Sequence, residues 1–195
     1  VLTTPEALVL YQQMAQAVEN GLTHVVMEVS SQAYKTKRVF GLTFDLGIFL
    51  NISPDHISPI EHETFEEYFL CKQELLLHSK KMVMNHESDH FEVLENLCQI
   101  NHIPYLTYGG SAADYPVIAM DDPRAFELKS ATDPLAINGN YALTMFGHFN
   151  HENAAAALLA TAWLETPRNH MKESLSKCVI PGRMTLFDLP NGALA

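Results

Sequence analysis

The chain has 195 residues, a formal net charge of −11 at pH 7 and 47% hydrophobic residues. This length and composition allow one large domain, or one and a half small ones, with a sizeable core. The acidic balance argues against nucleic acid or an anionic membrane surface as a partner. Cys71, Cys98 and Cys178 are too few and too far apart for a disulfide framework or a zinc pattern, which favours a reducing cytoplasm. No apolar stretch reaches membrane-spanning length, so we expect no membrane insertion.

The chain up to about residue 110 predicts an alternation of helices and strands. Thr4-Pro5-Glu6 is typical of a helix start, with Thr as the N-cap and Pro in the first position. Thr64-Phe65-Glu66-Glu67 is a capping box that predicts the start of a later helix. The expected strands are short and apolar, and they cover residues 23–29, 44–52, 81–85 and 103–107. This order predicts an α/β fold with a doubly wound, mostly parallel sheet and flanking helices.

The second part of the chain predicts a small antiparallel sheet, because its strands follow one another without helices between them. These strands are expected at residues 117–120, 126–130, 135–137 and 141–146. Asn138-Gly139 is a strong hairpin signal between the last two. Helices are expected at residues 150–164 and 169–177, and a strand at residues 184–189 would lead into a further part. The chain opens on Val1 and stops on Ala195, and we expect it to be a piece of a longer protein.

Polar side chains follow the first two predicted strands. Glu28 ends the first with Ser30 beside it, and Asp55-His56 follows the second. In a parallel α/β sheet, ligands bind at the edge where the strands end. A carboxylate there can hold a Mg²⁺ that bridges nucleotide phosphates, whereas histidine is an unusual ligand for that ion. These residues predict half of a site for a nucleotide and its metal, with a solvated acid and a structural Asp-His pair as the alternatives.

Further candidates lie on the predicted helices. Lys72 has apolar neighbours, and burial near a site would lower its pKa and make it reactive, although a lysine on a helix surface is usually solvated. Asn150 and Asn153 open the alanine-rich helix, where they are either N-caps or donors to a base or sugar. Arg183 suits a phosphate. The sequence contains no G-x-x-x-x-G-K-S/T phosphate loop.

Taken together, these segments resemble the Mur ligases, in the branch of the UDP-N-acetylmuramoyl-tripeptide synthetases (MurE). The resemblance covers essentially the whole chain and rests on the following segments, in this order: Thr3-Thr4-Pro5, Met27 to Ala33, Asn51 to His56, Tyr68 to Lys72, Gly147 to Asn153, and Pro181-Gly182-Arg183. Gln32 and the run from Ser53 to His62 are similar to the lysine-adding enzymes of Gram-positive cocci.

The resemblance implies a domain organisation. Residues 1–183 would be the central, ATP-binding domain without its phosphate loop, and residues 184–195 would begin the C-terminal domain. It also implies an ATP-dependent ligase of peptidoglycan precursor synthesis, which joins UDP-MurNAc-L-Ala-D-Glu to a diamino acid, L-lysine in this branch, through an acyl phosphate. Mg²⁺ would neutralise charge on the transferred phosphoryl group. We expect this piece alone not to catalyse, and an exposed sheet edge would let it associate with itself.

The resemblance also assigns roles to single residues. Glu28 and His56 would be Mg²⁺ ligands, and Lys72 would react with CO₂ to form a carbamate that holds a second Mg²⁺. His56 and Lys72 would thereby be the catalytic residues. The remaining residues would contact substrates: Thr3, Thr4, Ser30 and Arg38 the UDP-MurNAc-dipeptide, Asn150 and Asn153 the adenine, and Arg183 the ribose or phosphates of ATP.

Three other interpretations stay open at the level of the sequence. A ligase like folylpolyglutamate synthetase would share the fold and the carbamate lysine, although Thr3-Thr4-Pro5 and the run from Glu28 to Ser31 favour the Mur ligases. A non-catalytic binding module could keep the fold without the phosphate loop. A zinc hydrolase built on Asp55, His56 and His62 is the third alternative.

Overall fold

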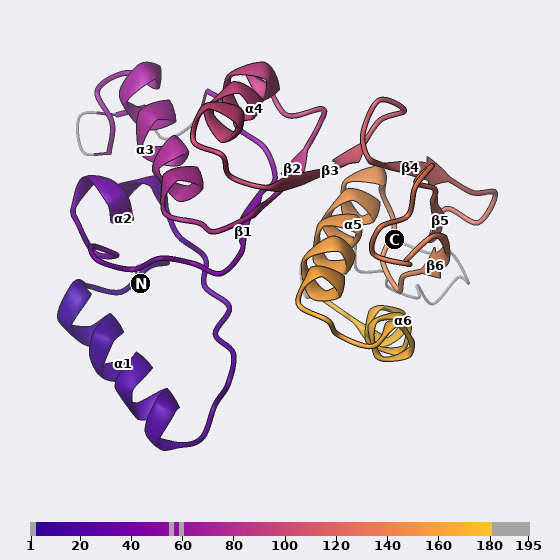
Figure 1. Ribbon diagram of the computed structural model, residues 1–195, viewed down its shortest axis with the longest axis horizontal. Helices are drawn as coiled ribbons and strands as arrows, with labels where there is room; N and C mark the ends of the chain where they lie inside the picture. Colours follow the sequence, from indigo (N-terminus) through magenta and orange to yellow (C-terminus); the bar gives the residue numbers. More distant parts are fainter. Residues whose placement is uncertain (1–2, 55–56, 59–60, 181–195) are drawn as a thin grey trace, which may run out of the picture. The chain divides into compact units, whose positions relative to one another are not determined.

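The computed structural model describes residues 3–54, 57–58 and 61–180 (Figure 1). The strand expected at residues 184–189 lies outside them. The chain divides into two compact units. The first comprises Val1–Gly47, Ile52–Met82 and Glu92–Pro104, and the second comprises Ile48–Asn51, Val83–Phe91 and Tyr105–Ala195.

The first unit is helical. Its helices are α1 (Ala7–Glu19), α2 (Ser31–Lys35), α3 (Phe65–Leu77) and α4 (Phe91–Ile100), of which Phe91 alone is counted with the second unit. The hydroxyl of Thr64 accepts a hydrogen bond from the backbone N–H of Glu67, so the predicted cap of α3 is confirmed. Helices α2 and α3 pack against each other, and a small core of Leu10, Ala33 and Val39 lies under α1 and α2.

Helix α1 starts differently from the prediction. Its N-cap is Glu6, with no side-chain capping bond, so the assignment of Thr4 as the cap is wrong. The Thr4 hydroxyl instead donates to the backbone oxygen of Glu28 at 2.9 Å. Leu10 of this helix is buried, but Leu8 and Val18 are 81% and 74% exposed. Helix α1 is therefore held to its unit by a narrow contact.

The strand expected at residues 23–29 is also wrong, because this segment has no regular secondary structure. A strand needs a neighbour that accepts and donates backbone hydrogen bonds. Among the described residues no strand pairs with this segment, and Val26 is 99% exposed. Val25 and Val26 face solvent, whereas Val29 packs against the small core of the first unit.

The second unit is built on a six-stranded sheet in the order β1-β2-β3-β4-β5-β6. The strands are β1 (Gly47–Phe49), β2 (Met82–Asn85), β3 (Tyr105–Gly109), β4 (Tyr115–Ala119), β5 (Ala125–Leu128) and β6 (Gly139–Ala142), with Gly47 and Met82 counted in the first unit. Strands β3 and β4 are parallel, whereas β4, β5 and β6 pair antiparallel. The α/β class is confirmed, and the antiparallel strands continue the main sheet instead of forming a second one.

Strands β2 and β3 run in the same direction. The N–H of Met82 bonds the oxygen of Pro104 at 2.9 Å, and the N–H of His86 bonds the oxygen of Tyr108 at 2.8 Å. Both partners advance by the same number of residues, which is the register of a parallel pair. The carboxyl ends of β2 and β3 therefore meet at one edge, as the helix–strand alternation predicts.

The hairpin predicted at Asn138-Gly139 is wrong, because residues 135–137 form no strand and continue a turn at residues 134 and 135. The Asp133 carboxylate accepts the N–H groups of Ile137 and Asn138 at 2.8 and 3.0 Å. The Asn138 side chain bonds both the N–H and the oxygen of Ser130, at 2.6 and 2.7 Å. Asn138 therefore closes the long β5–β6 connection, and Gly139 begins β6.

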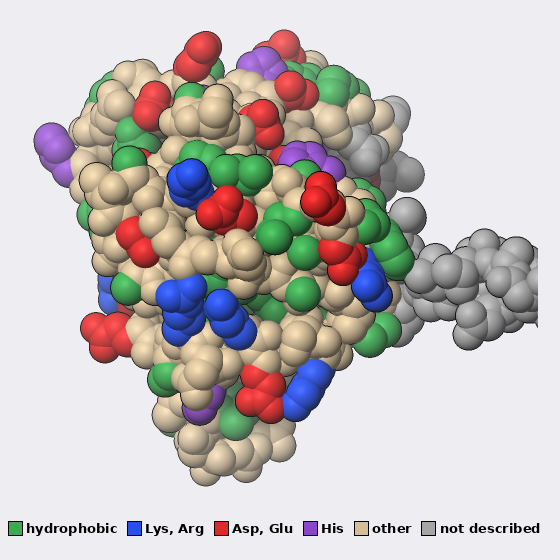
Figure 2. All heavy atoms as spheres, turned by 90° about the vertical axis from the view of Figure 1, so that its right-hand side faces the viewer, with side chains coloured by type: hydrophobic (Ala, Val, Ile, Leu, Met, Phe, Trp, Pro, Cys, Tyr) green, Lys and Arg blue, Asp and Glu red, His purple; other side chains and the backbone are tan. Residues whose placement is uncertain are grey.

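Helices α5 (His148–Trp163) and α6 (Arg168–Lys177) complete the second unit. Helix α5 packs on β3, β4 and β5, and α6 packs on β6 (Figure 1). The small side chains of α5 let it approach the sheet closely, and Ala155, Leu158 and Leu159 are almost fully buried. On the face shown in Figure 2, acidic and basic side chains are interspersed instead of forming a field of one sign. None of the helices in the described part of the chain has the length and apolar character needed to cross a membrane.

Candidate functional site

Lys72 lies on α3 and is partly buried. Burial lowers the pKa of its ammonium group, and the nearby Glu28 carboxylate opposes this shift. Its Nζ lies 5.7 Å from the centre of the Tyr68 ring, one turn earlier on the same helix. The structure thus brings together two of the residues predicted from distant segments, Glu28 and Lys72, in the first unit.

The Glu28 segment is held in place by Thr4. The Thr4 side chain is fully buried, and its hydroxyl accepts the N–H of Ser30 at 3.1 Å while it donates to the oxygen of Glu28. Ser30 in turn caps α2, because its hydroxyl accepts the N–H of Ala33 at 3.3 Å. Two residues predicted to contact substrate therefore also fix the backbone on either side of Val29, next to the Glu28 carboxylate.

Arg38 is buried against the start of α1. Its Nε lies 3.1 Å from a carboxylate oxygen of Glu6, and its guanidinium donates to the oxygen of Thr4 at 3.4 Å. The cation predicted to meet an anionic ligand is thus already paired with an acid of its own unit, which sequence reasoning did not identify. Thr3, the remaining residue of this group, is exposed.

A second polar group links α2 to α3. The His62 ring is fully buried, and its Nε2 lies 2.8 Å from the hydroxyl oxygen of Ser31. Glu67 accepts the backbone N–H of Glu63 at 2.9 Å and pairs with Lys35 at 2.8 Å. The hydrogen bond from Lys35, followed by that from Glu63, lowers the pKa of Glu67. His62 was considered only as a zinc ligand from the sequence, and its burial beside the capping box was not foreseen.

The other predicted residues are distributed as follows. Asp55, His56 and Arg183 lie outside the described residues. Asn150 is buried in α5 and donates to the oxygen of Phe146 at 2.6 Å, whereas Asn153 is exposed. The N-cap of α5 is Gly147, so neither asparagine caps this helix.

One further group in the second unit has the donor atoms of a metal site. The ligand atoms of Glu87, His148 and Glu152 lie within 4.8 Å of one another, the only such group in the described residues. Burial, and to a smaller degree the Glu87 carboxylate, raises the pKa of Glu152, while His148 opposes the shift. Glu87 and His148 are exposed, and exposed groups of this kind are common without an ion, so the arrangement carries no metal assignment by itself.

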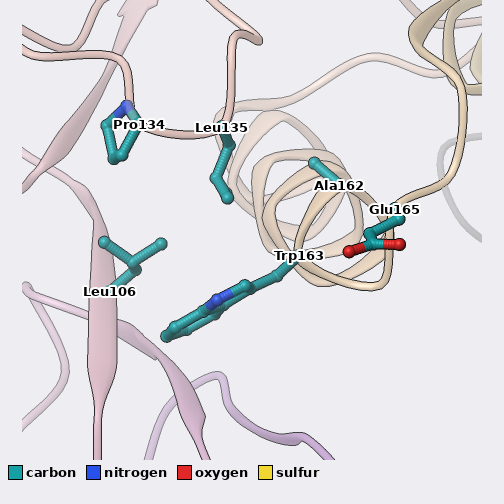
Figure 3. A pocket seen from close by; sticks show the side chains of 6 residues that line it. All are labelled: Leu106, Pro134, Leu135, Ala162, Trp163 and Glu165. Carbon is teal, nitrogen blue, oxygen red and sulfur yellow. The ribbon is translucent and has the colours of Figure 1, made fainter.

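The larger of two shallow pockets is apolar and lies in the second unit (Figure 3). It has a volume of about 460 Å³, and the side chains of Leu106, Leu135 and Trp163 point into it. The smaller, of about 390 Å³, lies beside α1 in the first unit and is lined by Leu8, Tyr11 and Phe40 among others. None of the predicted site residues lines either pocket.

Residues 1–161 match the family described as Mur ligase middle domain. The chain belongs to the Mur ligase family. It is 47% identical to the UDP-N-acetylmuramoyl-L-alanyl-D-glutamate--L-lysine ligase of Enterococcus faecalis (strain ATCC 700802 / V583), over 98% of this chain and 39% of the relative. It is 46% identical to the UDP-N-acetylmuramyl-tripeptide synthetase of Lactococcus lactis subsp. cremoris (strain MG1363), over 98% of this chain and 38% of the relative.

A solved structure is similar over nearly the whole length. It is the structure of a UDP-N-acetylmuramoyl-L-alanyl-D-glutamate--2,6-diaminopimelate ligase, with a TM-score of 0.82 and 27% identity over 95% of this chain and 39% of that chain. The Mur ligase chain therefore spans about two fifths of the length of these relatives.

Proposed function

We propose that this Mur ligase domain belongs to an enzyme that joins L-lysine to UDP-MurNAc-L-Ala-D-Glu at the expense of ATP, in peptidoglycan precursor synthesis. The lysine ligase at 47% identity supports the substrate class. The observation that carries the proposal is the partial burial of Lys72, which lowers its pKa, with the Glu28 carboxylate close enough to oppose that shift.

The proposed reaction has two chemical steps. The γ-phosphoryl group of ATP passes to the D-glutamate carboxylate, which gives an acyl phosphate and ADP. The neutral amine of L-lysine then attacks the acyl carbon, and the tetrahedral intermediate collapses to the amide as inorganic phosphate leaves. The protein's part is positioning and electrostatic stabilisation, because phosphoryl transfer needs little covalent help.

Mg²⁺ would supply charge neutralisation on the transferred phosphoryl group. Glu28 offers the carboxylate oxygens that this ion prefers. Lys72 fits the carbamate role, because only a neutral amine adds CO₂ to give an N-carboxylate and a proton, and a lowered pKa enlarges the neutral fraction. His56 is the third proposed ligand. Under this proposal Lys72 presents an anion where the unmodified chain has a cation.

The remaining assignments extend the same proposal. Thr3, Thr4, Ser30 and Arg38 would bind the UDP-MurNAc-dipeptide, and Asn150, Asn153 and Arg183 would bind ATP. The position of Thr4 and Ser30 next to Glu28 supports a substrate carboxylate near the metal. Because Arg38 is paired with Glu6, its proposed contact with substrate requires that the ligand share or replace that carboxylate.

The test measures phosphate release from ATP by the complete protein. UDP-MurNAc-L-Ala-D-Glu is present or absent, and L-lysine or meso-diaminopimelate is added in turn. Release that needs both the dipeptide and L-lysine, and that is lost in Lys72→Ala but kept in Lys80→Ala at an exposed site, is the expected result. Release without the dipeptide would contradict the substrate, and a folate-type ligase would then have to be tested.

A further inference from the structure

His62 is the buried meeting point of three segments of the first unit, and neither the motifs nor the proposed reaction gives it a role. Its side chain is fully buried. A buried imidazole with specific polar contacts is costly unless its hydrogen bonds are made, so its place between these segments needs a physical reason.

The first contact ties His62 to the segment that carries Glu28. Its Nε2 lies 2.8 Å from the Ser31 hydroxyl oxygen, and Ser31 is itself buried. Ser31 is the first residue of α2 and follows Ser30, whose N–H bonds the Thr4 hydroxyl. A shift of the imidazole would therefore move the backbone next to Glu28.

The second contact ties His62 to the helix that carries Lys72. The His62 and Tyr68 rings are 5.4 Å apart between centroids and tilted by 54°. The Nζ of Lys72 lies 5.7 Å from the centre of the same Tyr68 ring. Tyr68 is buried in a closely packed environment, so a displacement of the His62 ring would shift the Tyr68 ring and, with it, Lys72.

The third contact joins the backbone of His62 to Ile57 and Ser58. The backbone oxygen of His62 accepts the N–H of Ser58 at 2.9 Å, and Ile57 and His62 form a β-bridge. The Ser58 hydroxyl also accepts the N–H of Glu61 at 3.2 Å. Ile57 and Ser58 are thus held to the backbone of His62.

We propose that His62 is a positioning residue that holds the segments carrying Glu28 and Lys72 in one register for the metal-dependent step. The inference rests on the proposed function. The His62 side chain touches neither substrate nor metal in this scheme and acts through Ser31 and Tyr68. Substituting such supporting residues reduces metal affinity or activity by roughly 10- to 100-fold.

The decisive variants separate the hydrogen bond from the packing. His62→Gln can place an amide near the position of Nε2 and keep the bond to Ser31. His62→Phe keeps a ring against Tyr68 and loses the bond, and Ser31→Ala removes the same bond from the other side. His170→Gln, at an exposed position of α6, is the control. If the bond carries the effect, the losses of His62→Phe and Ser31→Ala will not add in the double variant.

The measurements use the complete protein. The ¹³C NMR signal after exchange with ¹³C-bicarbonate reports the Lys72 carbamate, with Lys72→Ala as the blank, and a Mg²⁺ titration of phosphate release reports half-saturation and kcat. We expect His62→Phe to weaken the carbamate signal and to raise the Mg²⁺ half-saturation by roughly 10-fold, with the KM for L-lysine unchanged. His62→Gln should retain most of both.

Two outcomes would overturn the inference, and they are distinguishable. A His62→Phe protein with a lowered melting temperature but an unchanged carbamate signal and Mg²⁺ half-saturation would make His62 a packing residue only. A wild-type protein with neither a carbamate signal nor Mg²⁺-dependent phosphate release would remove the proposed function together with this inference.

Discussion

At Lys72, burial and a neighbouring carboxylate act on the ammonium group in opposite directions. Desolvation favours the neutral amine and Glu28 favours the charged one, with burial the larger effect. Sequence reasoning could select Lys72, because its apolar neighbours on a helix predict partial burial. It could not place Glu28 beside it, since that proximity depends on how α3 packs against the segment before α2.

His62 shows a different limit of prediction. A histidine in a polar loop gives no sequence signal of burial, and only the contacts with Ser31 and Tyr68 reveal it. Arg38 is similar, because its charge suggested a ligand while the structure supplies Glu6 as a partner. Pairings between distant residues therefore require the fold.

Glu152 gives a prediction for the dependence of stability on pH. Its pKa is raised above the usual value of 4.5, so the folded state binds its proton more tightly than the unfolded state. The stability that this proton contributes is complete below pH 4.5 and is lost as the pH rises through the raised pKa. We therefore expect Glu152→Gln to be more stable than the wild type at pH 7.5 but not at pH 4, by about 0.5 kcal/mol because solvent screens the partly exposed group.

Urea unfolding of the two proteins at both pH values measures this difference. Glu173→Gln is the matched control, because Glu173 lies on an exposed face of α6 and pairs only with the exposed Lys177 among the contacts described for it. Equal changes in stability with pH for wild type and Glu152→Gln would show that the Glu152 environment does not favour the protonated form.

At the scale of the element, α3 depends on its N-cap residue, Thr64. The Thr64 hydroxyl satisfies the N–H of Glu67 at 3.1 Å, a donor without a partner inside the helix. We expect Thr64→Ala to destabilise the protein by about 1 kcal/mol, whereas Thr64→Ser should be nearly neutral. Chemical denaturation of the three proteins tests this. A loss as large in Thr64→Ser as in Thr64→Ala would assign the effect to the methyl group instead of the cap.

The start of β1 is constrained by space. A Cβ added at Gly47 would lie 2.4 Å from the Met82 sulfur and 2.5 Å from the Ser79 hydroxyl oxygen. Because Gly47 is buried and both neighbours belong to packed segments, we expect Gly47→Ala to lower the free energy of unfolding by about 1 to 3 kcal/mol. The measurement is denaturant unfolding, with Ser111→Ala at an exposed loop position as the control. A neutral Gly47→Ala would mean that Met82 moves aside freely.

The elements that were predicted correctly are those with local causes. The capping box fixed the start of α3, and the apolar run at residues 81–85 gave β2 almost to the residue. The prediction of a strand at residues 23–29 was wrong, because strand formation depends on a neighbouring strand, which the sequence of the segment itself does not specify. The hairpin predicted at Asn138-Gly139 does not form, because the Asn138 side chain bonds the backbone of Ser130 across the β5–β6 connection. Turn propensities describe neighbouring residues and do not include a contact of this sequence separation.

At the scale of the whole molecule, the chain forms two compact units, and helix α1 of the first unit buries fewer side chains than helix α5 of the second. The alternation of helices and strands was sufficient to predict the α/β class. It was not sufficient to predict that strands β4 to β6 extend the main sheet, because a pattern of strands without helices is equally consistent with a separate small sheet.

Hydrogen exchange should reveal the difference in burial between helices α1 and α5. Helices α1 and α5 are of similar length, 13 and 16 residues, yet α1 buries only Leu10 among its side chains whereas α5 buries eight. Helical stability in proteins comes mainly from the packing of one face, so α1 should open locally while α5 opens only with the core. We expect the amides of α1 to exchange at least about 100-fold faster than those of α5 after correction for intrinsic rates, which corresponds to about 2.8 kcal/mol in opening free energy.

The measurement is exchange by mass spectrometry on the 195-residue chain. The variant Leu10→Ala makes the test more specific. Loss of the buried Leu10 side chain should abolish the remaining protection of the α1 amides from exchange and leave that of the α5 amides unchanged. Equal protection of the two helices in the wild type would contradict the prediction. It would mean that the exposed side chains of α1, with Leu8 at 81% and Val18 at 74%, are covered in solution. Sedimentation at several concentrations would then show whether a second copy covers them.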